Sequence, residues 1–314
     1  MAQIIHVAVG VVRSNNAKFL ISKRLKNLHQ GDLWEFPGGK VEANETVREA
    51  LIRELIEELN IIVKHAEPLI KFSHQYLDKH VLLDVWIVDE YEGLAESQNN
   101  QPLKWLSLNE LSNYSFPAAN QVILKCLSLP PYYAITGEFK NKRDFLQKFQ
   151  TCLNNGIKLI QLRYKGNDNS LLLELAKHSK KLCDDAGAKL LVNSTIDFLR
   201  LCDVDGIHLN SQQLHQHLSR PISKNKILAA SVHTRNDLLQ AIKIKADFVV
   251  VSPVFNTTSH PAATTLGWDG FSELLNSSNI PVYALGGMKK IMLADVKRNG
   301  GFGVAAISAF WNKQ

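Results

Sequence analysis

The chain has 314 residues, of which 45% are apolar and 21% charged, a composition typical of a globular protein with ample apolar side chains for its core. The net charge of +6 is unevenly divided, because residues 1–131 carry an excess of acidic side chains and residues 132–314 an excess of basic ones. The basic residues are scattered without interleaved aromatic side chains, so we expect no direct binding to nucleic acid. Neither a run of 18 apolar residues nor a signal-peptide pattern occurs, so we expect a cytoplasmic protein without a membrane span.

The first half of the chain begins with two predicted strands. Residues 4–12 and 18–22 are apolar runs on either side of a cluster of turn-forming residues, which predicts a hairpin. Further strands are predicted at residues 69–76, 80–89 and 104–106, and a last helix starts near residue 118. Several strands around one long helix, without strand–helix alternation, indicate an α+β fold.

The long helix is predicted to start after Thr46 and to run to about Leu59, behind a loop that contains Gly38 and Gly39. Thr46 and Glu49 have the spacing of a capping box, which satisfies the first backbone N–H groups of a helix. Apolar residues recur along one face at three- and four-residue spacing, so this face is expected to pack inward.

A second face of the same helix carries Glu54, Glu57 and Glu58. Carboxylates at these spacings repel one another unless a cation is shared between them. Hard oxygen ligands of this kind suit Mg²⁺, with Mn²⁺ as an alternative, and such an ion usually also holds substrate phosphates. A solvated acidic face is the simpler alternative for three glutamates alone.

The joint spacing of these residues decides between the two interpretations. Gly39, Glu45, Arg53-Glu54, Glu57-Glu58 and Ile61 match the Nudix box, G-x5-E-x7-R-E-U-x-E-E-x-G-U with U aliphatic, at every fixed position but one. Asn60 stands where the box has its last glycine. We expect the geometry to survive, because asparagine is the best non-glycine residue for a left-handed helix end.

Residues 3–128 resemble the MutT-type Nudix hydrolases, the 8-oxo-dGTP diphosphatases, through the segments RLKNLH, LWEFPGGKVEANET and FPAANQVI. The resemblance implies a sandwich fold, a nucleoside triphosphate substrate, metal-assisted attack of water on phosphorus, and sanitation of the nucleotide pool. The metal would be held by Gly38, Glu54, Glu57 and Glu58, and Arg53 would join the three glutamates as a catalytic residue. The substrate would be bound by Arg24, Phe36, Gly39, Lys40, Lys79 and Asn120.

Three of these substrate residues have distinct implied roles. Arg24 would contact a phosphate, Phe36 would line the base pocket, and Asn120 would hydrogen-bond the purine edge. Asn120 has an alternative role as a cap of the last helix. The MutT pattern also has a further carboxylate ligand where this chain has Asn99, so either Glu96 replaces it or one metal site is weaker.

The double proline Pro130-Pro131 marks a domain boundary, which predicts a Nudix domain at residues 1–130 and a second domain at 131–314. Beyond it, eight short apolar runs alternate with helical segments, which predicts an α/β TIM (β/α)8 barrel with its site at the carboxyl ends of the strands. The runs are residues 132–136, 158–164, 189–193, 206–210, 227–233, 248–254, 282–287 and 301–308.

Polar residues and glycines near the ends of these runs predict a ligand-binding mouth. Gly286-Gly287 and the turn at residues 306–308 fit a phosphate site made of backbone N–H groups, so a phosphorylated small molecule is the expected ligand. The predicted ligand residues are Gln161, Arg163, Lys165, Asn193, Ser231, His233, Gly287, Ile307 and Ser308.

The second half resembles thiamine phosphate synthase and its thiazole tautomerase relatives through the segments YYAIT, QLRYK, GIHL, SVHT, SPVFNTT, ALGGM and GVAAIS. The synthase pattern needs two Mg²⁺-binding aspartates where this chain has Ser194 and Gln213, and a lysine where it has His260. Three interpretations follow: a module that binds or senses a phosphorylated ligand, a tautomerase with His233 as acid and base, and a weakened synthase. In a further alternative, the Nudix domain hydrolyses a pyrophosphate of the thiamine pathway.

Overall fold

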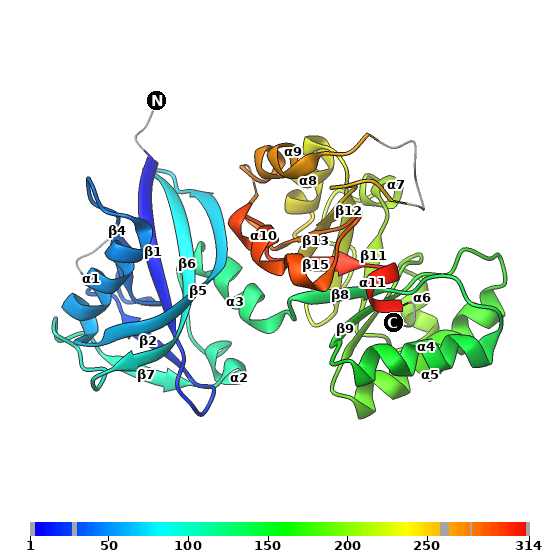
Figure 1. Ribbon diagram of the computed structural model, residues 1–314, viewed down its shortest axis with the longest axis horizontal. Coiled ribbons are helices and arrows are strands. Elements are labelled where there is room, and N and C mark those ends of the chain that lie inside the picture. The colour runs from blue at the N-terminus through cyan, green and yellow to red at the C-terminus, as the bar shows by residue number, and fades with distance from the viewer. Residues whose placement is uncertain (1–3, 27–29, 258–263, 277, 312–314) are drawn as a thin grey trace. The chain divides into compact units, whose positions relative to one another are not determined.

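The structure, a computed structural model, describes residues 4–26, 30–257, 264–276 and 278–311 (Figure 1). The chain divides into two compact units, Met1–Ser128 and Leu129–Gln314, each of which has its own core. Within the described ranges, no helix is both long and apolar enough to cross a membrane.

The first unit contains two sheets. The larger one has the order β4-β1-β6-β5, formed by Gly38–Lys40, Ile4–Val12, His80–Glu92 and Ile62–Gln75. The smaller one has the order β3-β2-β7, formed by Trp34–Glu35, Phe19–Lys23 and Leu103–Leu106. The helices of this unit are α1 (Val47–Leu59), α2 (Leu108–Leu111) and α3 (Asn120–Ser128). The expected α+β class is confirmed, although β1 pairs with β6 in parallel.

Helix α1 begins and ends as the sequence predicts. The Thr46 side chain accepts from the backbone N–H of Glu49, and the Glu49 carboxylate accepts from that of Thr46, which completes the capping box. Asn60 ends the helix in the left-handed conformation, with φ 56° and ψ 35°. The buried face, which includes Leu51 and Leu55, packs in the core with residues of β1 and β6.

The hairpin predicted for residues 4–22 is wrong. Strand β1 is hydrogen-bonded to β4 along one edge and to β6 along the other, so it has no free edge for β2. Strand β2 pairs with β3 and β7 instead, and an isolated bridge between Arg13 and Phe19 links the end of β1 to the start of β2.

Two further segments of this unit differ from the prediction. Gly38–Lys40 is a short strand rather than a loop, and β5 starts at Ile62 rather than at residue 69. Strand β5 carries register shifts on both sides of His65 and again between Pro68 and Ile70. A proline and bulges interrupt the alternation of polar and apolar residues, so the sequence pattern does not predict the first part of this strand.

The second unit is a closed barrel of eight parallel strands, which confirms the predicted architecture. The strands are β8 (Tyr132–Ile135), β9 (Leu159–Leu162), β10 (Lys189–Val192), β11 (Gly206–Leu209), β12 (Ile227–Val232), β13 (Phe248–Val251), β14 (Val282–Ala284) and β15 (Gly303–Ala306). Each predicted apolar run contains one of them. Nearly every strand residue is buried, as expected where helices cover the outer face of a parallel sheet.

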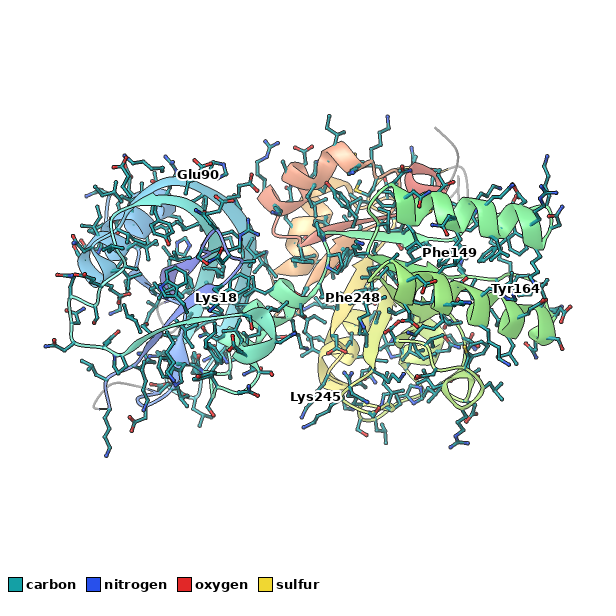
Figure 2. All side chains as sticks on the ribbon, turned by 90° about the horizontal axis from the view of Figure 1, so that it is seen from below. Lys18, Glu90, Phe149, Tyr164, Lys245 and Phe248 are labelled. Atoms are coloured by element: carbon teal, nitrogen blue, oxygen red, sulfur yellow. The ribbon has the colours of Figure 1, made fainter. Side chains whose placement is uncertain are left out.

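Helices alternate with the strands around the barrel (Figure 1). They are α4 (Lys142–Asn154), α5 (Asn169–Asp185), α6 (Phe198–Leu201), α7 (Ser211–Leu214), α8 (Arg235–Lys243), α9 (Gly267–Leu275), the 3-10 helix η1 (Lys290–Met292), α10 (Leu293–Arg298) and α11 (Ser308–Trp311). Phe149 on α4, labelled in Figure 2, is fully buried in the core that these helices form with the strands.

Aromatic rings fill the interior of the barrel. Tyr133, Tyr283 and Phe248, the last of which is labelled in Figure 2, are fully buried, and their ring centroids lie 4.9–5.7 Å apart. The prolines before the barrel also belong to it. The Tyr283 hydroxyl donates to the Pro130 carbonyl at 2.5 Å, and the Val304 N–H donates to the Pro131 carbonyl at 2.9 Å.

Candidate active site and barrel mouth

The glycine pair at β4 forms the floor of the candidate active site. A Cβ atom on Gly39 would lie 2.1 Å from the Glu54 carboxylate, and one on Gly38 would lie 2.2 Å from the carbonyl oxygen of Ala8. The Gly38 N–H donates to the Glu58 carboxylate at 3.1 Å. Only glycine therefore lets β4 approach β1 and the two carboxylates of α1 this closely.

Arg53 connects helix α1 to the segment that precedes it. Its guanidinium donates to both carboxylate oxygens of Glu45, at 2.7 and 3.2 Å, and to the Lys40 carbonyl at 3.0 Å. It also donates to Glu54 at 2.9 Å and to Glu57 at 3.4 Å. The hydrogen bond to Glu45 raises the pKa of Arg53, which keeps the guanidinium charged. The predicted catalytic arginine thus lies where it orients the carboxylate of Glu54.

Three carboxylates crowd together behind the glycine pair. Burial, together with the neighbouring charges of Glu35 and Glu54, raises the pKa of Glu58 to about 7 against the lowering effect of the Gly38 N–H. Burial also raises the pKa of Glu35, against the lowering effect of its ion pair with Arg24. Negative charge at this position therefore lacks full compensation, which is the condition that a divalent cation relieves.

Glu57 is placed differently from the other two glutamates. Its side chain is 59% exposed, against 16% for Glu54, and it contacts Arg53 at the longest of the guanidinium distances. Among the described residues, no three His, Cys, Asp or Glu side chains converge closely enough to hold a metal ion. A shared site would therefore require Glu57 to turn toward Glu54 and Glu58, which its exposure permits.

The loop after β6 packs against the end of α1. The backbone N–H of Glu96 donates to the Leu59 carbonyl, and that of Gln98 donates to the Glu58 carbonyl, both at 3.0 Å. The side chains of Glu96 and Asn99 are exposed. The loop therefore caps the helix with its backbone, and the possible replacement of Asn99 by Glu96 as a ligand stays a prediction.

The predicted base pocket is built around Phe36 and Asn120. Phe36 is 3% exposed and stacks on Phe116 with ring centroids 5.8 Å apart. Its N–H donates to the side-chain oxygen of Asn120 at 3.3 Å. Asn120 is the first residue of α3 and is 8% exposed, and its side chain joins this helix to the backbone between β3 and β4 instead of capping its own helix.

The other predicted substrate residues surround this pocket or the glycine floor. Arg24 forms its ion pair with Glu35, and Lys40 is exposed at the end of β4. The Lys79 carbonyl accepts from the Tyr76 N–H at 2.8 Å within the β5–β6 turn, and its ammonium lies 5.9 Å from the Tyr76 ring centroid. The Lys79 backbone thus closes the turn in the structure.

In the second unit, the predicted ligand residues come from five strand ends, those of β9, β10, β12, β14 and β15. Lys165, His233 and Ser308 are exposed, whereas Arg163, Asn193, Ser231 and Ile307 are half-buried. Gly287 adopts φ 66°, a conformation that favours glycine. Gln161 is 2% exposed and donates to the Tyr133 hydroxyl, so it lies deeper in the barrel than the sequence indicated.

The two residues that stand in place of the synthase aspartates contact each other. The Gln213 side-chain amide donates to the Ser194 carbonyl at 3.4 Å, and its oxygen accepts from the Asn210 N–H at 3.0 Å. Nδ1 of His233 donates to the Ser252 carbonyl at 2.7 Å. His260 lies outside the described residues.

The sequence interpretation missed Glu35 and Tyr133, which the structure places in these sites. Glu35 reaches the acidic cluster from β3, and Tyr133 and His208 link the predicted ligand residues inside the barrel. The polar residue in each of the short apolar segments YYAIT and GIHL was the available signal, because a polar side chain within a barrel strand needs a partner.

Comparisons with known proteins match each of the two units separately. Residues 132–310 match the family model described as "Thiamine monophosphate synthase", and residues 8–126 match that of the NUDIX domain. The putative thiamine-phosphate synthase 2 of Aquifex aeolicus is 35% identical over 184 residues, which cover 59% of this chain and 99% of the relative. The thiamine-phosphate synthase of Chloroflexus aurantiacus is 34% identical over 161 residues, 51% of this chain and 74% of the relative.

The first half has relatives of its own. The 8-oxo-dGTP diphosphatase of Escherichia coli is 36% identical over 120 residues, which cover 38% of this chain and 93% of the relative. The chain therefore belongs to the Nudix hydrolases through its first unit and to the thiamine monophosphate synthase family through its barrel.

Proposed function

We propose that the first unit is a Mg²⁺-dependent pyrophosphohydrolase that converts 8-oxo-dGTP and water to 8-oxo-dGMP and pyrophosphate. Gly38, Glu54, Glu57 and Glu58 would hold the cation, which would supply Lewis-acid polarisation of the phosphoryl oxygens. One of the glutamates would orient the attacking water. Arg24 would leave its ion pair with Glu35 and bind a phosphate group of the substrate.

The observation that carries this proposal is the seating of two carboxylates over the glycine pair. Glu58 accepts from the Gly38 N–H, and Glu54 lies against Gly39 with its carboxylate held by Arg53. The raised pKa of Glu58 supports the placement of a cation in this cluster, because uncompensated negative charge raises a carboxyl pKa. The similarity to an 8-oxo-dGTP diphosphatase over nearly its whole length supports the choice of substrate.

The test is a panel of pyrophosphate substrates offered to the full chain with Mg²⁺. We expect the highest kcat/KM for 8-oxo-dGTP among purine and pyrimidine nucleoside triphosphates. The panel includes the pyrimidine pyrophosphate of the thiamine pathway, because the barrel of the same chain belongs to the thiamine monophosphate synthase family. Preferred hydrolysis of the thiamine-pathway compound would replace the proposed substrate and keep the hydrolase assignment.

We propose further that the barrel binds a phosphorylated ligand without making thiamine phosphate. Ser194 and Gln213 contact each other and provide no carboxylate, so a bridging Mg²⁺ would lack its two anionic protein ligands. The glycine pair of residues 286 and 287 and the turn at residues 306–308 would offer backbone N–H groups to a phosphate. Binding would therefore be independent of metal.

Titration of the full chain with thiamine phosphate, with and without EDTA, tests the barrel proposal. We expect the same Kd in both conditions and no product when both synthase substrates and Mg²⁺ are supplied. The double variant Ser194→Asp with Gln213→Asp should make binding respond to Mg²⁺. Synthase turnover by the unmodified chain would refute the proposal, and turnover of a thiazole substrate that His233→Ala abolishes would favour the tautomerase alternative.

A further inference from the structure

A series of hydrogen bonds crosses the interior of the barrel from β9 to β12. The Gln161 amide nitrogen lies 3.0 Å from the Tyr133 hydroxyl, which lies 3.2 Å from Nδ1 of His208. Nε2 of His208 lies 2.9 Å from the hydroxyl of Ser231. Tyr133, Gln161 and His208 are at most 2% exposed, whereas Ser231 is half-buried near the carboxyl end of its strand. The series therefore joins the closed interior to the predicted mouth.

The chemistry of each group sets the direction of these bonds. The Gln161 amide nitrogen only donates, so the Tyr133 oxygen accepts there and gives its single proton to Nδ1 of His208. A neutral imidazole that accepts at Nδ1 carries its proton on Nε2, so His208 donates to Ser231. The Ser231 oxygen is then an acceptor inside the barrel, and its own proton is available for a bond outward.

The neutral form of His208 is the stable one in this environment. Burial, together with the positive charge of Arg163, which follows β9, lowers its pKa to about 3. Tyr133 on β8 is the other titratable group that faces the ring, and burial raises its pKa, so it stays protonated. His208 also holds Asn193 in place, because its backbone carbonyl accepts from the Asn193 side-chain amide at 2.9 Å.

We propose that His208 is a positioning residue which, with Tyr133 and Gln161, fixes the Ser231 hydroxyl as a hydrogen-bond donor to an acceptor atom of the barrel ligand. This inference rests on the proposed ligand site of the barrel. The acceptor is either a phosphate oxygen or a heterocycle nitrogen, and two probes distinguish them. Thiamine phosphate offers both kinds of acceptor, and inorganic phosphate offers only the first.

Tyr133→Phe removes the hydroxyl from the middle of the series and keeps the ring. Tyr283→Phe is the matched control, because Tyr283 is also fully buried and its ring lies 5.7 Å from that of Tyr133. Its hydroxyl donates to the Pro130 carbonyl and lies outside the series. The full chain is used throughout, with ¹⁵N NMR of the His208 imidazole and calorimetric titration of both probes.

We expect the wild-type spectrum to show His208 protonated on Nε2 alone, and Tyr133→Phe to lose this preference while Tyr283→Phe keeps it. Tyr133→Phe should bind thiamine phosphate roughly fivefold to tenfold more weakly, the value of one neutral hydrogen bond. Ser231→Ala should weaken binding similarly. Adding Tyr133→Phe to Ser231→Ala should weaken binding little further, because both changes act on the same hydrogen bond to the ligand. An equal loss for inorganic phosphate would identify a phosphate oxygen as the acceptor, and a loss for thiamine phosphate alone would identify the heterocycle.

Protonation of His208 on Nδ1, or a charged ring at neutral pH, would overturn the proposed direction of the bonds. Unchanged binding in Tyr133→Phe, with normal binding in the wild type, would overturn the positioning role. A wild-type chain that shows the expected His208 spectrum and binds neither probe would refute the proposed function of the barrel instead, while supporting the direction of the hydrogen bonds.

Discussion

Glu57→Gln is the sharpest test of the proposed hydrolase, because the structure separates its expected effect on activity from its effect on stability. The Glu57 side chain is 59% exposed and contacts Arg53 at 3.4 Å across one turn of α1. An exposed pair at this spacing contributes at most about 0.5 kcal/mol to the free energy of unfolding. Loss of a carboxylate that holds the cation should raise the barrier to hydrolysis by about 4 kcal/mol, roughly a thousandfold in kcat.

Glu49→Gln is the matched control on the same helix. Glutamine preserves the capping box with Thr46, so this variant makes the same change in charge without disturbing the helix start. Initial rates of pyrophosphate release from 8-oxo-dGTP, measured over a range of Mg²⁺ concentrations, and thermal melting curves are compared for both variants. We expect wild-type melting in both and a large loss of rate in Glu57→Gln alone. Wild-type turnover of Glu57→Gln at saturating Mg²⁺ would refute the assignment of this glutamate.

Three other predictions follow from named contacts. Asn120→Ala should leave the Phe36 N–H unpaired, which lowers the unfolding free energy by about 1–3 kcal/mol. The same variant should reduce the preference for purine over pyrimidine triphosphates roughly thirtyfold, a loss of about 2 kcal/mol. Asn120→Asp keeps the acceptor for Phe36, so it should preserve the unfolding free energy but lose the purine preference. Gly39→Ala should displace the Glu54 carboxylate, the flexible end of a side chain, so kcat/KM should fall on the order of tenfold, about 1.4 kcal/mol, while the melting curve changes little. The pKa of His208, about 3, lies below its usual value near 6.5. The contribution of His208 to folding stability is therefore complete above about pH 6.5 and is lost as the pH falls below that value, by up to about 1.4 kcal/mol per pH unit. In denaturant titrations between pH 7 and pH 4, the unfolding free energy of His208→Gln should depend less steeply on pH than that of the wild type, and an equal dependence would contradict the assignment.

Local signals in the sequence predict well those parts of the fold that local chemistry determines. The capping box of α1 and the left-handed Asn60 depend on residues within a few positions of one another, and both are found in the structure. The eight strands of the barrel are also marked by local apolar runs, and closure follows from their number and parallel order.

Local sequence patterns do not reveal contacts between segments that lie far apart in the chain. Strand β2 joins a second sheet because both edges of β1 are occupied, which no residue of β2 reveals. Asn120 finds its partner in Phe36, 84 positions earlier, and Glu35 reaches the acidic cluster through the path of β3. The predicted ligand residue Gln161 could be placed on its strand, but its depth in the barrel depends on Tyr133, which lies on another strand.

The prolines ahead of the barrel affect how the two halves of this chain can be studied separately. The carbonyl groups of Pro130 and Pro131 accept hydrogen bonds from Tyr283 and from the backbone of Val304, so both prolines are structural parts of the barrel wall. A barrel fragment that starts at Tyr132 would leave a buried tyrosine hydroxyl and a strand N–H without their acceptors. A protease or an engineered cut should therefore separate the halves before Leu129, and a fragment that begins there should melt at a higher temperature than one that begins three residues later.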